Sequence, residues 1–208
     1  MSNEPFRRMT AVTAPIIREN IDTDIIIPSR EMKSVGKQGL AEGLFAGWRY
    51  TAIGGREPNP EFVLNKPEYA GARFILGGGN FGCGSSREHA AWALAEYGIR
   101  AVIAPSFNPI FRGNCVRNGI VPVELPAEAI AELAAQVEQN PAAHQVTIDL
   151  EACAVHAPNG KTFTFSMDPE SREMLLEGLD AIEITLKRRA EIEAFREADR
   201  TARPWVYL

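Results

Sequence analysis

Gly77-Gly-Gly-Asn-Phe-Gly-Cys-Gly-Ser-Ser-Arg-Glu-His-Ala90 is the stretch of sequence that decides the fold. It follows a short apolar segment at 73–76 and leads into an alanine-rich segment at 87–97, so a strand, a turn and a helix are predicted in that order. Five glycines within residues 77–84 let the backbone adopt positive φ angles and approach a ligand closely. Ser85 and Glu88 have the spacing of a capping box, which predicts that the helix begins here.

The start of this predicted helix has the chemistry of an anion site. Unpaired N–H groups and the positive end of the helix dipole favour a negative charge. Arg87 adds a planar fork of donors that matches a carboxylate, and Ser85 and Ser86 add two hydroxyls. We therefore expect a carboxylate to bind at this point.

The same order of elements continues downstream of the glycine turn. Short apolar strands are predicted at 73–76, 101–104 and 120–123, and they alternate with helices at 87–97 and 107–118. This alternation is typical of parallel strands joined by right-handed crossovers. The further predicted elements are a proline-interrupted edge strand at 11–17, a buried strand at 25–27, a short helix near 38–45, a helix at 126–140, a strand pair at 146–150 and 163–165 with a tight turn at 159–160, a helix at 174–179, a strand at 182–186 and a charged helix at 187–200.

One α/β domain spanning residues 1–208 is the simplest organisation for this pattern, because the sequence shows no internal repeat and no linker. The charged helix and a short aromatic tail form its C-terminal part at about 187–208. The tail at 203–208 is expected to dock on a surface.

Composition and charge narrow the function. The chain has 45% hydrophobic and 24% charged residues, which is typical of a soluble globular protein. Its net charge of -5 argues against nucleic acid or an anionic membrane surface as the main partner. The N-terminal residues lack the apolar segment of a secretory signal, and three widely spread cysteines do not form a disulfide framework. These features predict a cytoplasmic protein without a membrane span.

Several familiar motifs fail at a required residue. Gly77-x-Gly79-x-x-Gly82 formally matches a dinucleotide fingerprint, but the next predicted strand ends without the acidic residue that would bind the ribose. No Lys-Ser/Thr pair follows the glycines, which excludes a P-loop, and no glycine follows the serines as in a hydrolase elbow. Cys83 with His89 could form a nucleophilic pair. A small residue packed in a tight turn is the simpler reading of Cys83.

Metal ligands are also missing from the pattern. The three cysteines are 32 and 38 residues apart, without the close pairs that usually ligate iron–sulfur clusters. The three histidines are equally scattered. We therefore predict that this chain alone holds no metal.

The motifs taken together resemble one family. Asn80-Phe-Gly-Cys-Gly-Ser-Ser-Arg-Glu-His-Ala90 and the upstream Asn20-Ile-Asp-Thr-Asp-x-Ile-Ile-Pro28 are similar to the small subunits of 3-isopropylmalate dehydratase, in the aconitase superfamily. The likeness extends over most of residues 10–190. It implies the swivelling β/β/α domain of that superfamily and an enzyme of leucine biosynthesis that isomerises 2-isopropylmalate to 3-isopropylmalate by dehydration and rehydration.

The resemblance also implies roles for residues. Ser85 would be the catalytic base as its alkoxide, with Ser86, Arg87, Arg30 and Lys33 binding the substrate. The segment with Glu31, Met32 and Ser34 would select among substrates. A [4Fe–4S] cluster would lie on a separate large subunit, so this chain would be half of a heterodimer that binds a small dicarboxylate.

Two departures from the family pattern leave the substrate open. Glu31 stands where an aromatic residue is expected, and Gly78-Gly79 replace bulkier residues. The alternatives are a related hydro-lyase that acts on another alkylmalate, of citramalate or dimethylmalate type, and a non-catalytic anion-binding module that regulates a partner.

Overall fold

A parallel four-stranded sheet forms the middle layer of the body. The computed structural model describes residues 3–32, 36–84 and 87–207. The sheet has the order β2-β3-β4-β5, and each neighbouring pair is parallel. Its strands are β2 (Thr13–Ile16), β3 (Phe74–Gly77), β4 (Ala101–Ala104) and β5 (Val121–Glu124). The predicted parallel strands are confirmed, and the proline-containing β2 lies at the sheet edge as expected.

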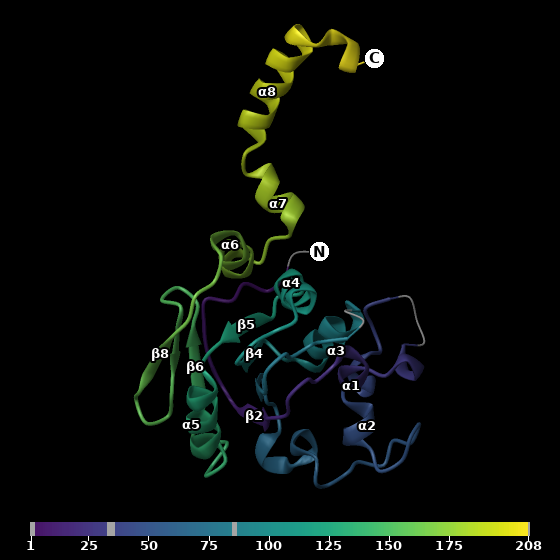
Figure 1. The fold of residues 1–208 in the computed structure, drawn as a ribbon, viewed down its shortest axis with the longest axis vertical. Helices are drawn as coiled ribbons and strands as arrows, with labels where there is room; N and C mark the ends of the chain where they lie inside the picture. Colours follow the sequence, from purple (N-terminus) through teal and green to yellow (C-terminus); the bar gives the residue numbers. More distant parts are fainter. Residues whose placement is uncertain (1–2, 33–35, 85–86, 208) are drawn as a thin grey trace.

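A second, antiparallel sheet covers one face of the first. Its order is β1-β6-β7-β8. The strands are β1 (Arg8–Ala11), β6 (Val146–Asp149), β7 (Ala154–His156) and β8 (Thr162–Thr164). In Figure 1 this sheet and α5 (Ala127–Val137) lie on the left, and α1 (Thr23–Ile26), α2 (Ala46–Arg49) and α3 (His89–Tyr97) lie on the right. The layers follow the expected β/β/α order.

Alternate residues of the parallel strands pack into two separate hydrophobic cores, one on each face of the sheet. Phe74 and Leu76 of β3 pack into the cluster shared with β6 and α5, whereas Ile75 between them packs into the cluster beneath α3. This alternation is the geometry of a strand buried on both faces. On the first face, Ile130 and Leu133 of α5 are buried as the helical periodicity predicts.

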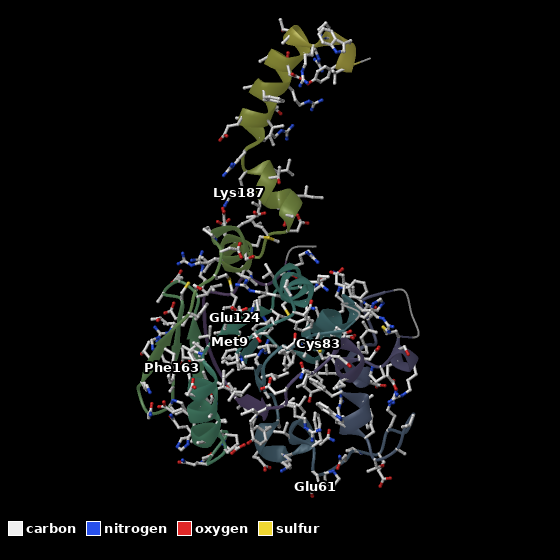
Figure 2. The ribbon with its side chains drawn as sticks, in the orientation of Figure 1. Met9, Glu61, Cys83, Glu124, Phe163 and Lys187 are labelled. Carbon is white, nitrogen blue, oxygen red and sulfur yellow. The ribbon has the colours of Figure 1, made fainter. Side chains whose placement is uncertain are left out.

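The C-terminal elements extend away from the body (Figure 1). They are α7 (Ala181–Leu186) and α8 (Arg189–Ala202), whereas α4 (Pro109–Arg117) and α6 (Pro169–Glu177) lie on the body. Neither α7 nor α8 buries a described residue. Lys187 lies at the junction, where its Nζ contacts Glu173 at 2.6 Å and Glu177 at 2.7 Å (Figure 2). In the tail, Tyr207 donates to Asp199 of α8 at 2.8 Å, and Arg203 Nη2 pairs with Asp199 at 2.6 Å. Trp205 and Val206 stay mostly exposed, so the described tail contacts α8 through Tyr207 and Arg203.

Two predicted strands are wrong because side-chain caps convert them to helices. The isoleucines at 25–27 follow Asp22, whose carboxylate accepts the Ile25 N–H at 2.7 Å and caps α1. Residues 182–186 form α7, because Asp180 and Glu183 make a reciprocal capping box. In both places a local cap outweighs the β-branched composition.

Other boundaries also differ from the prediction. The tight turn at 159–160 joins β8 to β7, a strand that the sequence reading missed, rather than joining 146–150 directly to 163–165. The helix expected at 174–179 begins earlier, because Asp168 caps it, and it ends at Gly178. The helix near 38–45 is a 3₁₀ turn at Ala41–Gly43 followed by α2. The helix after the glycine turn begins at His89, two residues later than expected.

Candidate active site

Three loops meet at the carboxyl edge of the parallel sheet. They follow β2, β3 and β4, and their described residues are 17–24, 78–84 with 87–88, and 105–108. The backbone of the glycine turn pairs with both neighbours, since Thr23 N–H donates to Cys83 O at 2.9 Å and Phe81 N–H donates to Ser106 O at 3.0 Å. In open α/β sheets ligands bind at this edge. The glycine turn and Arg87 therefore lie at the edge where this topology favours a ligand site.

Close backbone approach explains two of the glycines. A Cβ at Gly78 would lie 2.3 Å from the carbonyl oxygen of Arg18, so the missing bulk lets the loops pack together. Gly82 has φ +75°, and a Cβ there would lie 2.1 Å from the Phe111 ring. The Gly78-Gly79 departure from the family pattern thus has a packing explanation.

Two asparagines link the loops through their side chains. Asn20 and Asn80 both have positive φ, at 56° and 54°, a conformation that asparagine tolerates better than most residues. Asn80 Nδ2 donates to Asn20 Oδ1 at 2.8 Å, and the Asn80 N–H donates to Ser106 Oγ at 2.8 Å. Asn80 in the glycine turn is therefore hydrogen-bonded to both neighbouring loops, through Asn20 and Ser106.

Arg87 lies next to the N-terminus of α3 and pairs with α1. Its Nη1 is 3.1 Å from Asp24 Oδ1, and its side chain is 38% exposed. A guanidinium has five N–H donors, so Arg87 can hold Asp24 and a bound carboxylate together. The sequence does not predict this contact, because it joins residues that are far apart in the chain.

A cavity of about 320 Å³ opens beside Asp24. Arg30 and the half-buried Trp48 ring form part of its wall, and the Arg18 guanidinium stacks on Trp48 at 4.5 Å from the ring centroid. The full lining is Asp24, Ile25, Pro28, Ser29, Arg30, Gly47 and Trp48. The cavity therefore combines one cation, Arg30, with an apolar wall and the Asp24 carboxylate that pairs with Arg87.

Glu31 is buried rather than directed into this cavity. Its carboxylate contacts Arg56 Nη2 at 2.6 Å and Arg30 Nε at 3.5 Å. The negative charge that departs from the family pattern is thus neutralised inside the protein. Met32, the next residue, is half-buried and packs against the core beneath α3.

The cysteines do not form a nucleophile or a ligand set in the described chain. Burial, and secondarily the charge of Asp22, raises the pKa of Cys83, which opposes thiolate formation. Cys115 is fully buried, and Cys153 packs against the core of the antiparallel sheet. Among residues 3–32, 36–84 and 87–207, no three His, Cys, Asp or Glu side chains are grouped to hold a metal.

The structure brings some of the predicted residues together. Arg87 and Arg30 approach the same carboxylate-lined cavity, Arg87 through Asp24 and Arg30 as part of the wall. Ser85, Ser86, Lys33 and Ser34 lie outside the described residues. A larger cavity of about 670 Å³ lies between α6, α7 and α8, and its lining includes none of the predicted site residues.

Comparison with known proteins identifies the family. The model of the aconitase C-terminal domain matches residues 3–128, and the LeuD_N model matches residues 131–169. A 3-isopropylmalate dehydratase small subunit from Cupriavidus necator is 57% identical over 205 residues, covering 99% of each chain. The chain belongs to the 3-isopropylmalate dehydratase small subunits.

Two further relatives support this family assignment. A small subunit from Magnetococcus marinus is 44% identical, again over 99% of each chain. The crystal structure of a 3-isopropylmalate dehydratase (leuD) from Methanocaldococcus jannaschii superposes with a TM-score of 0.63 and 28% identity, covering 91% of this chain and 99% of that one. The predicted family, fold class and function as a dehydratase small subunit are confirmed. The name small subunit implies a large-subunit partner. No helix among the described residues is long and apolar enough to cross a membrane.

Proposed function

We propose that this chain supplies the base and the carboxylate-binding half of the active site of a 3-isopropylmalate dehydratase. The reaction isomerises 2-isopropylmalate to 3-isopropylmalate by removing water and adding it back in the other sense, in leucine biosynthesis. The observation that carries the proposal is the Arg87–Asp24 pair beside α3, which adjoins a cavity with Arg30 in its wall, in a member of this family.

Proton abstraction is the step that the chain's own residues serve. The Ser85 alkoxide takes the carbon-bound proton next to a carboxylate, so an O–H bond forms as the C–H bond breaks. The electron pair of that bond becomes the new C=C bond as hydroxide leaves, and rehydration reverses these steps at the other carbon. A serine hydroxyl is too weakly acidic to ionise in water. The N-terminus of α3 and Arg87 provide the positive field that stabilises its anion.

Substrate carboxylates require fixed cations. Arg87 binds one carboxylate through its fork, held in orientation by Asp24, and Ser86 adds a hydrogen bond. Arg30 from the cavity wall and Lys33 from the same segment attract the second carboxylate. Ile25 and Trp48 offer the apolar surface that an alkyl substituent needs.

The large subunit completes the site. It carries a [4Fe–4S] cluster, which supplies the Lewis acid for the departing hydroxide. The described residues of this chain offer no ligand set for such a cluster. The heterodimer works in the cytoplasm, a location supported by the acidic sequence and the unpaired cysteines.

Packing bears on the alternative substrates. The two departures that pointed to another alkylmalate are Glu31, which is buried against Arg56, and Gly78, which packs against the Arg18 backbone. Neither places a charge in the cavity, so both are compatible with an isopropyl group.

Mutation of Ser85 tests the proposal. The complex with the large subunit, purified anaerobically, should lose turnover of 2-isopropylmalate on Ser85→Ala while assembly and most substrate binding remain. Ser166→Ala, an exposed serine away from the cavity, is the matched control and should keep full turnover. Unchanged turnover in Ser85→Ala would favour the non-catalytic binding module. A panel with citramalate and dimethylmalate decides the substrate.

A further inference from the structure

Glu31 is the one buried carboxylate among the described residues. Its residue exposure is 7%, and the other buried polar or charged side chains are Thr13, Thr23, Arg100 and Asn114. Burying an unpaired carboxylate costs on the order of several kcal/mol. A protein that buries this carboxylate must therefore provide partners for it.

The principal partner comes from a different loop. Arg56 Nη2 donates to Glu31 Oε2 at 2.6 Å, and the Arg56 guanidinium stacks on Tyr50 with 5.0 Å to the ring centroid. The hydrogen bond that Arg56 donates to Glu31 is the largest cause that raises the pKa of Arg56. The pair ties the 3₁₀ turn at Ser29–Glu31 to residues 51–58, which contribute nothing to the cavity wall.

The space around Glu31 is shaped for this arrangement. A Cβ at Gly43 would lie 2.6 Å from the Glu31 Cβ and 3.2 Å from its Cγ. Any larger residue at Gly43 would therefore displace the Glu31 side chain from its position beneath Arg56.

The same turn carries the cavity wall. Ser29 and Arg30 line the cavity, and Glu31, the next residue, is directed into the protein. Arg30 Nε is 3.5 Å from the second oxygen of Glu31. The Glu31 carboxylate thus contacts Arg56 through Oε2 and contacts Arg30, the cation in the cavity wall, through Oε1.

We propose that Glu31 and Arg56 are positioning residues for substrate binding, which fix the turn Ser29–Glu31 and hold the Arg30 guanidinium toward a substrate carboxylate. This inference rests on the proposed function, because it takes the cavity as part of the substrate site. Neither residue touches the reacting atoms, so their loss acts on substrate affinity rather than on the chemical step.

Kinetics of the reconstituted complex test the proposal. Arg56→Gln should raise the KM for 2-isopropylmalate about tenfold, the size expected for one lost charge-assisted hydrogen bond, with kcat within about twofold. Glu31→Gln should raise KM by at least a similar factor, and the double variant should show no rise beyond Glu31→Gln alone, because that change already breaks the contact with Arg56. Arg56→Lys keeps the charge and should restore most of the affinity.

Glu42→Gln is the matched control. Glu42 is 78% exposed and lies 3.8 Å from Arg56 Nε, so its loss should leave KM unchanged. An unchanged KM in Arg56→Gln would overturn the inference. So would a fall in kcat as large as the rise in KM, if Arg56→Lys does not reverse it. If Glu31→Gln fails to fold, the Arg56 pair of variants decides, since that side chain is 40% exposed. A wild-type complex without any alkylmalate turnover would instead refute the proposed function.

Discussion

Gly82→Ala is a change for which the structure predicts a large loss of stability in the site loops. Gly82 has φ +75°, and an added Cβ would lie 2.1 Å from Phe111 Cγ and 2.6 Å from Phe111 Cβ. Phe111 is fully buried and packs against Phe81 with 5.7 Å between ring centroids. Because the near atoms include the stem of the ring, a rotation of the ring alone cannot relieve the contact.

The magnitude has two parts. A non-glycine residue in the left-handed region costs about 1–2 kcal/mol, and overpacking a core position adds about 1–3 kcal/mol. Gly82→Ala should therefore lower the free energy of unfolding by about 2–5 kcal/mol. Gly98→Ala isolates the first part, because Gly98 has φ +104° with no atom within 4 Å of the added Cβ.

Thermal unfolding of the two variants measures the difference. For a chain of this size each kcal/mol lowers Tm by roughly 2–4 °C, so Gly82→Ala should melt well below Gly98→Ala. Equal Tm values would refute the close packing of the glycine turn on Phe111.

Three further predictions concern Cys83, Glu96 and the C-terminal helix α8. Cys83→Ser should keep nearly full turnover in the complex, and the Cys83 thiol should react slowly with iodoacetamide at pH 7, because its raised pKa keeps it protonated. Burial alone would raise the pKa of Glu96, but the N–H groups of Gly39, Ala41 and Leu40 lower it below 4.5, so Glu96→Gln should cost about 1 kcal/mol at pH 7 after solvent screening. A lowered carboxylate pKa stabilises the fold at pH values above the pKa of the unfolded chain, so urea titrations should show that this cost disappears as the pH falls through the lowered pKa of Glu96. Removing residues 189–208 should shift Tm by less than about 3 °C, since α8 buries no described residue, and a larger loss would contradict this packing.

The sequence predicts the middle sheet well because its signals are local. Each strand is a short apolar run, and Gly98 adopts the left-handed conformation expected at the end of α3. The errors at 25–27 and 182–186 arose because β-branched residues suggested strands, although Asp22 and the Asp180–Glu183 box were readable as helix starts. The missed strand β7 has three residues, too few for a visible alternation.

For the candidate site, the sequence indicates residues more readily than the contacts between them. The glycine turn and Arg87 carry a local pattern, whereas the Asp24–Arg87 and Glu31–Arg56 pairs join loops through the tertiary fold. The sequence alone shows no partner that would neutralise the Glu31 carboxylate beside a proposed isopropyl pocket. The arginine that neutralises it lies 25 residues away in sequence.

Titration of the large subunit with this chain tests the central claim most directly. Turnover of 2-isopropylmalate should be absent with either chain alone, rise with added chain and reach a plateau at equimolar amounts. The Ser85→Ala chain should give no turnover and should lower the activity of the wild-type mixture in proportion to its share, because it still assembles. Turnover and stoichiometric iron in the isolated chain, or full activity with Ser85→Ala, would contradict the account.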